Sequence, residues 1–139
     1  MATTATINLS SSDLMGNFPM NWSASTTLTK AGSNDDIAET TGLARRKLAA
    51  TTKVDLVEFA DTTITADKSA KIYIKNTGTD ESRYVQVFIN SVEIGRLYGG
   101  EGGLGDWMLM PYAGGSGEDI EVAPSHDDAV VLEYMVFFE

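Results

Sequence analysis

The residues of this chain with the clearest potential for chemistry lie in its last third. Gly100, Gly102 and Gly105 have the G-x-G-x-x-G spacing of loops that bind dinucleotide phosphates. That function needs a helix directly after the glycines, because the helix N-terminus holds the pyrophosphate. Here the sequence continues with DWMLMP at positions 106–111, which is typical of a short strand ended by proline. We therefore expect a glycine loop between two strands and no nucleotide site.

Acidic residues near the C-terminus could bind calcium or act as a catalytic pair. Calcium takes about six to eight oxygen ligands, and glycoside hydrolysis needs two carboxyl groups. The EF-hand spacing is missing and no pair stands out, so we expect solvated acids in turns. The acids concerned are Glu118, Asp119, Glu121, Asp127 and Asp128.

The chain contains one histidine and no cysteine. Disulfides, zinc–thiolate sites and thiol nucleophiles are therefore excluded. His126 lies in the segment PSHDD at positions 124–128, which predicts a turn. A serine and an aspartate that flank a histidine in sequence do not make a catalytic triad. We expect an exposed turn histidine, no cofactor, and a protein that is not an enzyme.

The formal net charge of −10 is concentrated toward the C-terminus. Residues 97–139 contain nine acidic residues and no lysine or arginine, whereas residues 1–96 are nearly balanced. Nucleic-acid binding needs a basic face. No segment has the roughly 18 consecutive apolar residues of a transmembrane helix. We therefore expect neither a nucleic-acid partner nor a membrane partner.

Arg45, Arg46 and Lys47 form the only cluster of basic residues. They could be a solvated strand face. They could also contact an acidic surface of a neighbouring protein, including the acidic last third of a second copy, in a salt-sensitive way. Four aromatic residues could form a carbohydrate-stacking platform, although core packing is the commoner role of aromatic side chains. These are Trp22, Tyr98, Trp107 and Tyr112.

Short strands with turns between them must position these residues. Residues 22–30 alternate between apolar and polar, as in a half-buried strand. Asn90 and Ser91 link two strands as a β-hairpin. We expect a strand over 39–50, for which a helix is the alternative. Residues 131–139 are apolar on both faces, which predicts a strand inside a sheet and covered on both sides. The other expected strands are 53–59, 71–75, 84–89, 92–97, 107–110 and 120–122.

The pattern predicts an all-β fold, a β-sandwich or jelly roll of about eight to ten short antiparallel strands. A length of 139 residues suits one domain. We expect a sandwich domain over 22–139, preceded by an N-terminal extended arm or loop over 1–21. Four apolar residues of the arm have no clear period and could dock on a partner or fold back on the domain. They are Leu14, Met15, Phe18 and Met20.

Between Lys71 and Glu139 the chain has the segments KIYIKNTG, YVQVFINSVEIGRL, GDWMLMPYAG, EDIEVAPS and VLEYMVFFE in that order. This half of the chain resembles small virion proteins of tailed bacteriophages, especially capsid decoration (cement) proteins. The resemblance is a pattern of strands with a Gly-Asp-Trp-apolar-Pro turn, and it contains no catalytic signature.

The resemblance implies an all-β structural protein that assembles in many copies on a phage particle. The expected partners are the major capsid protein or another virion protein, and further copies of this chain, with a trimer favoured. The expected location is the virion, after assembly in the cytoplasm of the host bacterium. The alternative function is a carbohydrate- or receptor-binding β-module of a phage tail or fibre. The expected contact surfaces are the four apolar arm residues, the basic cluster, and the loops at 99–106 and 112–118.

Overall fold

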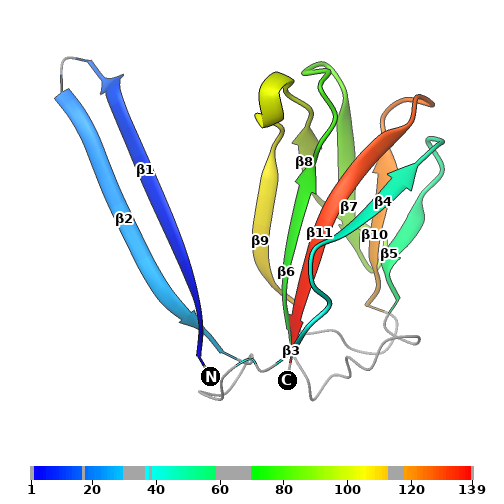
Figure 1. Cartoon of the computed structure of the whole chain (residues 1–139). Coiled ribbons are helices and arrows are strands. Elements are labelled where there is room, and N and C mark those ends of the chain that lie inside the picture. The colour runs from blue at the N-terminus through cyan, green and yellow to red at the C-terminus, as the bar shows by residue number, and fades with distance from the viewer. Residues whose placement is uncertain are drawn as a thin grey trace.

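The computed structural model describes residues 2–16, 18–29, 37, 39–58, 70–112 and 118–138. These residues form eleven strands and one short 3₁₀ turn (Figure 1). Nine strands belong to two larger sheets, and the first two form a separate hairpin. The strands are β1 Thr3–Met15, β2 Phe18–Leu28, β3 Glu39–Thr40, β4 Ala44–Leu48, β5 Val54–Val57, β6 Ala70–Asn76, β7 Tyr84–Ile89, β8 Val92–Tyr98, β9 Trp107–Tyr112, β10 Ile120–Pro124 and β11 Val130–Phe138, and the turn is η2 Glu101–Gly103.

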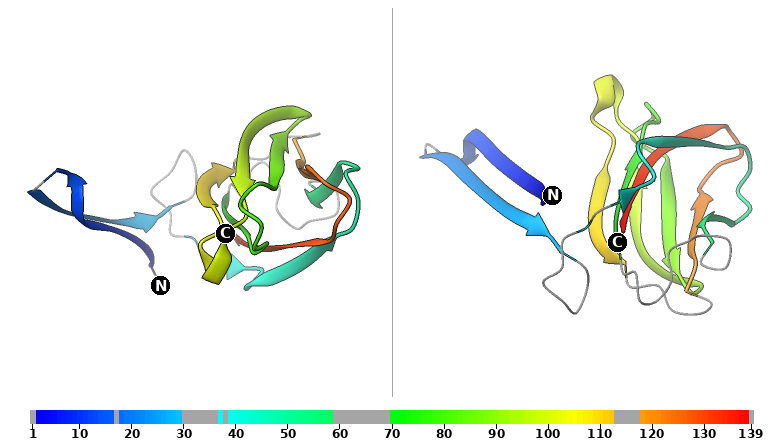
Figure 2. Two further views of the ribbon diagram at one scale, coloured as in Figure 1. Left: turned by 90° about the horizontal axis from the view of Figure 1, so that it is seen from above. Right: turned by 60° about the horizontal axis from the view of Figure 1, so that its bottom comes forward.

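The two larger sheets form a sandwich that encloses the core (Figures 1 and 2). One sheet has the order β5-β10-β7-β8, and the other has the order β3-β11-β6-β9, with β4 also paired to β11. Alternate residues of each strand point inward. Ile72 and Ile74 of one sheet and Val85 and Val87 of the other are fully buried. The predicted all-β antiparallel sandwich is therefore confirmed.

The C-terminal strand β11 lies inside its sheet, between β6 on one side and β3 and β4 on the other. This position is the predicted one. Its burial is one-sided, however, because Leu132 and Val136 are buried while Glu133 and Met135 on the opposite face are half-buried. The prediction of a strand covered on both faces is wrong. The outward apolar side chains lie beside large neighbours on the same face, such as Met135 opposite Tyr73, and this shields them without a further layer.

The local structure agrees with turn and strand chemistry at the β7–β8 hairpin, in residues 39–50 and in β9. The hairpin between β7 and β8 is confirmed, and the φ angles of 47° at Asn90 and 64° at Ser91 match a type I′ turn. Residues 39–50 form strands β3 and β4 rather than a helix. Strand β9 continues through Pro111 to Tyr112, beyond its predicted end. Proline is tolerated there because β9 is at the edge of its sheet.

The N-terminal segment is part of a β-hairpin, where the sequence predicts an extended arm or loop over 1–21. Strands β1 and β2 pair antiparallel from Thr3 opposite Leu28 to Met15 opposite Phe18. Strand β2 crosses the expected domain boundary at residue 22, so the strand that begins near Trp22 belongs to the hairpin and not to the sandwich. The cause is the alternation of apolar and polar residues in both strands. In the observed register, apolar residues of β1 lie opposite apolar residues of β2, as Leu9 does opposite Trp22.

The base of the hairpin is joined to the sandwich. The N–H of Ile37 donates to the carbonyl of Leu28 at 3.4 Å, and Nζ of Lys71 donates to the carbonyl of Thr29 at 2.6 Å. Leu28 and Ile37 are both buried. From this base the two strands project away from the sandwich (Figures 1 and 2).

Candidate functional site

The projecting hairpin is a ribbon with two different faces. Because side chains alternate along a strand, the register places alternate residues of β1 and their partners in β2 on the same face. One face, here called the apolar hairpin face, consists mainly of Ala5, Ile7, Leu9, Met20, Trp22 and Ala24. The opposite face is polar at every position from residue 4 to 10 and from 21 to 27. Its members are Thr4, Thr6, Asn8, Ser10, Asn21, Ser23, Ser25 and Thr27.

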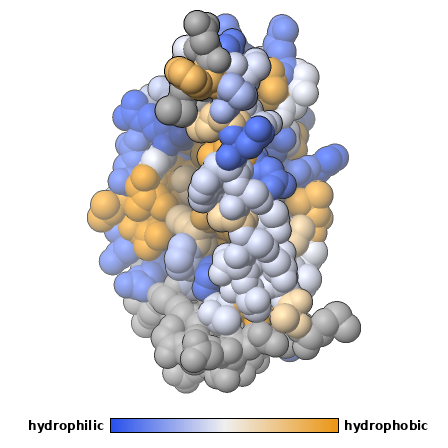
Figure 3. Space-filling model, turned by 90° about the vertical axis from the view of Figure 1, so that its left-hand side faces the viewer, coloured by the Kyte–Doolittle hydropathy of each residue, from blue (hydrophilic) through white to orange (hydrophobic). Residues whose placement is uncertain are grey.

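The apolar hairpin face is open to solvent. The exposed fractions are 38% for Ile7, 48% for Leu9 and 50% for Trp22, and Phe18 near the tip is 73% exposed. Figure 3 looks at the side from which the hairpin projects, where the surface nearest the viewer is mostly of intermediate hydropathy and hydrophobic groups lie above and beside it. An isolated two-stranded hairpin is only marginally stable in water, and grouped exposed apolar residues mark interaction sites. This face is therefore the best candidate for a functional surface.

The polar face stabilises the register of the hairpin. The hydroxyls of Thr6 and Ser25 lie 3.2 Å apart across the strands. Oγ of Ser23 donates to Oδ1 of Asn8 at 2.7 Å. Through these cross-strand contacts the polar side chains form hydrogen bonds with one another. Burial of the opposite, apolar hairpin face would stabilise the hairpin further.

The hairpin is almost uncharged. Asp13, near the tip, is the only charged residue between positions 2 and 29. Without lysine or arginine, the hairpin offers no cation to the phosphates of nucleic acid or of anionic lipid. Apart from Asp13 and Pro19 near the tip, its outer edges also lack the charges and prolines that usually keep edge strands from pairing with other chains. These properties fit a protein partner.

The predicted arm residues fall on this hairpin. Phe18 and Met20 lie in β2, with Met20 half-buried on the apolar hairpin face. Leu14 and Met15 lie at the end of β1, and their side chains are outside the described part of the structure. The sequence-based set lacks Ile7 and Leu9. The alternation of TATINLS at positions 4–10 is the signal that identifies them.

The basic cluster is divided between the two faces of β4. Arg45 and Lys47 are exposed, whereas Arg46 is half-buried and donates to the backbone carbonyl of Asp55. The guanidinium of Arg45 pairs with the carboxylate of Glu133 at 3.0 Å across β4 and β11. The structure thus does not bring the three cations together as one basic surface.

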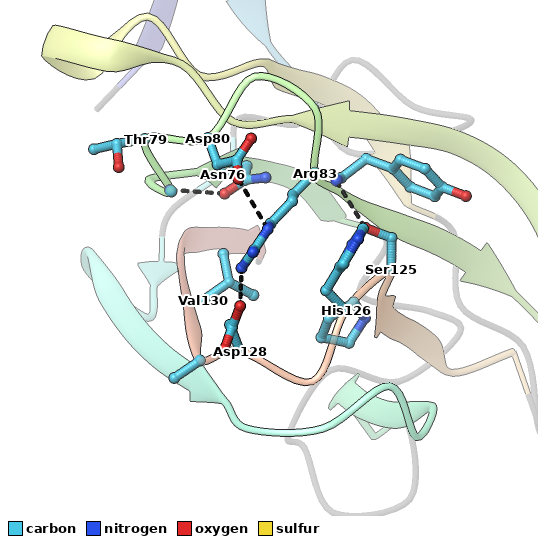
Figure 4. A pocket seen from close by; sticks show the side chains of 12 residues that line it. Asn76, Thr79, Asp80, Arg83, Ser125, His126, Asp128 and Val130 are labelled. Atoms are coloured by element: carbon cyan, nitrogen blue, oxygen red, sulfur yellow. Dashed lines mark hydrogen bonds and ion pairs between the residues drawn. The ribbon is translucent and has the colours of Figure 1, made fainter.

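A depression of about 140 Å³ lies between the loops that follow β6 and β10 (Figure 4). Arg83 is its central charge, and Figure 4 shows its guanidinium between Asp80 and Asp128. Nε of Arg83 lies 2.9 Å from the Asp80 carboxylate, and Nη1 contacts that of Asp128. Hydrogen bonds from Ser82 lower the pKa of Asp80, which therefore remains ionised as a partner of Arg83. The depression is a loop-to-loop ionic contact and has no free cation for a ligand.

The serine and histidine beside this depression do not form a nucleophilic relay. Oγ of Ser125 accepts from the backbone N–H of Tyr84 at 3.0 Å and lies 2.9 Å from Nδ1 of His126. The carboxylate of Asp127 accepts from Thr51 at 3.2 and 3.3 Å, so Thr51 and not His126 is its hydrogen-bond partner. Hydrogen bonds between Ser125 and Tyr84 thus connect the end of β10 to the start of β7.

The predicted glycine loop between two strands is confirmed, and its glycines have a packing role. The turn η2 follows β8, and the chain then enters β9 without an α-helix. A β-carbon on Gly105 would overlap the carbonyl oxygen of Asn76, and one on Gly100 would lie 2.8 Å from the carbonyl carbon of Leu104. Other backbone segments pack too closely for side chains at these two positions.

The acidic residues of the last third do not converge. Glu118, Asp119 and Glu121 lie at the start of β10, while Asp127 and Asp128 follow its end. A hydrogen bond from Lys53 lowers the pKa of Glu121, and the two groups pair at 2.7 Å. Among the described residues, no group of three histidine, cysteine, aspartate or glutamate side chains is placed to hold a metal ion.

The four aromatic residues considered for carbohydrate stacking are divided among the core, the hairpin and the two sheets. Tyr112 is buried, its hydroxyl donates to the carbonyl of Glu118 at 2.9 Å, and burial raises its pKa to about 12. Trp107 and Tyr98 are exposed on β9 and β8, which belong to different sheets. Trp22 is on the hairpin. Of the predicted contact loops, 99–106 is described above, and residues 113–117 of the other lie outside the described residues.

Comparisons with known proteins identify no relative, because no family profile, curated protein or solved structure matches the chain. In the described part of the chain, no helix has the length and apolar content needed to cross a membrane.

Proposed function

We propose that the protein is a non-enzymatic structural protein of a bacteriophage particle, which binds and stabilises the capsid shell as a decoration protein. The observation that carries this proposal is the exposed apolar hairpin face on an element that projects from the sandwich. The assignment to a phage particle is supported by the sequence resemblance to decoration proteins. The proposed location is the virion, after assembly in the host bacterial cytoplasm.

The hairpin is not needed to complete the core. The main cluster of buried apolar residues is drawn from β4 to β11 and includes none from β1 or β2. A hairpin that adds hydrated apolar surface and open strand edges is a hazard for aggregation unless a partner covers it. Its presence on an otherwise complete domain supports a role in assembly.

The proposed mechanism is mass action. A protein that binds only the assembled shell stabilises it by about 2.7 kcal/mol per site when its free concentration is about 100 times its Kd. Many copies on one particle add these contributions, and multivalent contacts slow the loss of any one subunit. Weak individual contacts are sufficient for this function.

The tail- or fibre-type carbohydrate-binding alternative has less support. A stacking platform needs aromatic side chains on one surface. Here the three exposed aromatic residues considered lie on the hairpin, on β8 and on β9. The depression around Arg83 has no free cation for an acidic sugar, since two carboxylates already contact it.

Co-sedimentation with shells assembled from the major capsid protein of the same phage tests the proposed function. We expect the full-length protein to bind, and we expect Leu9→Asp to weaken binding by roughly tenfold to a hundredfold. Burial of a leucine side chain contributes about 1.5–3 kcal/mol, and the new carboxylate resists transfer out of water.

The matched control is Asn8→Asp, which adds the same charge one residue away on the polar face. It should bind like the unmodified protein. Failure of the unmodified protein to bind shells would show that the proposed function is wrong. Equal binding by the two variants would show that shell binding does not depend on the apolar hairpin face.

A further inference from the structure

We infer that the surface covering the apolar hairpin face is the same face of a second copy of this chain, so that the protein self-associates through its hairpins before it meets a shell. This inference rests on the proposed function in taking the hairpin as the assembly element. It adds the identity of the hairpin's partner.

The distribution of charge favours the hairpin as the place where two copies meet. Residues 2–29 contribute one negative charge, so the rest of the chain carries a net charge of −9 out of the total of −10. Like charges of this size keep protein bodies apart. Two hairpins can approach face to face with little repulsion, because each projects from its sandwich and Asp13 near the tip is its only charge.

The chemistry of the face is complementary to itself. Large side chains, Leu9 opposite Trp22, are followed along the ribbon by Ile7 opposite the small Ala24. Two such faces can pack in the manner of stacked sheets, which lie about 10 Å apart with interdigitating side chains. The result is a four-stranded, two-layered unit with an apolar interior, which is a more stable arrangement than a hairpin alone.

The attachment of the hairpin argues against its folding back on its own sandwich. Leu28 is buried at the base, and its carbonyl accepts from the N–H of Ile37. Lys71 of β6 holds the carbonyl of Thr29. A rotation that brought the apolar hairpin face onto its own domain would have to break these contacts, whereas a second copy can reach the face without changing them.

Single-cysteine variants test the pairing directly, because the natural chain contains no cysteine. Ala24→Cys places a thiol on the apolar hairpin face, and Ser25→Cys places one on the polar face of the same strand. Under mild oxidation of the full-length protein, without shells, we expect a disulfide-linked dimer for Ala24→Cys and little for Ser25→Cys. Equal cross-linking of the two variants, or none in either, would overturn the inference.

The solution mass provides the second measurement. Light scattering of the unmodified protein should give at least twice the 14.9 kDa of one chain, and the oligomeric fraction should increase with salt as repulsion between the acidic bodies is screened. Trp22→Asp should reduce the mass to that of one chain, while Ser23→Asp should leave it unchanged. A lower mass for Trp22→Asp can result from a lost contact between copies or from an unfolded hairpin. The cysteine variants distinguish the two explanations, because their small substitutions leave the hairpin folded.

The outcomes distinguish this inference from the proposed function. A protein that remains monomeric at every concentration and salt level, yet binds shells through the apolar hairpin face, overturns the inference and leaves the function standing. In that case the partner is the shell protein. A protein that oligomerises through its hairpins but binds no shell supports the inference and contradicts the function.

Discussion

Replacement of Gly105 by alanine is expected to lower the free energy of unfolding by roughly 3 kcal/mol, at the upper end of the usual cost of overpacking. The new β-carbon would overlap the carbonyl oxygen of Asn76. Both groups are fixed to the backbone, so no side-chain rotation relieves the overlap. The loop cannot move away easily, because the N–H of Asp106 donates to Tyr98 at 2.8 Å and the N–H of Asn76 donates to Asp106 at 3.0 Å.

Urea unfolding of the full-length protein measures this effect. The control is Leu104→Ala, in the same loop, whose side chain is 82% exposed. A surface change of this kind should alter stability by no more than about 0.5 kcal/mol. If Gly105→Ala were as stable as Leu104→Ala, the packing role assigned to the glycine loop would be wrong.

Asn76→Ala is expected to destabilise the fold by about 2–4 kcal/mol, since each buried polar group left unpaired costs about 1–3 kcal/mol. Asn76 is 2% exposed, at the end of β6. Its Nδ2 donates to the carbonyl of Leu97 in the opposite sheet at 2.9 Å, and its Oδ1 accepts from the N–H of Gly78 at 2.8 Å. One side chain thus joins the two sheets and fixes the following turn.

The same unfolding measurement applies, with Thr79→Ala as the control because Thr79 is exposed in the adjacent turn. Asn76→Asp should destabilise at least as much as Asn76→Ala. It removes the donor to Leu97 and introduces a carboxyl group in a buried position. A loss below about 1 kcal/mol for Asn76→Ala would mean that water replaces both hydrogen bonds.

Much of the sandwich could be predicted because its strands show the signals that govern local structure. The alternation in β6 and β7 matches their burial, and Asn90 and Ser91 form the predicted two-residue turn, in which asparagine is a residue type that tolerates a positive φ. The strand order could not be predicted. It depends on pairings such as β11 with β4, between residues more than 80 positions apart in the chain, and no local pattern contains that information.

The candidate site was only partly predictable. Phe18 and Met20 stand out in the sequence as apolar residues without a clear period, but the sequence does not identify β1 as the strand that pairs with them. In β1, every second residue from Ala5 to Leu9 is apolar, including Ile7. Because the strand is rich in threonine and serine, this alternation is weak in the sequence. A face that stays exposed in the single chain also cannot be separated from a core face by sequence pattern, because both have the same alternation.

Amide hydrogen exchange across β1 and β2 tests most directly whether the apolar hairpin face is covered in the working assembly. In dilute free protein these amides should exchange fast, because a two-stranded hairpin opens readily. In shell-bound protein we expect strong protection of the amides of β1 and β2, with little change in the core strands β6 and β7. Equally fast exchange of the hairpin amides in the free and bound states would show that no partner covers the apolar hairpin face.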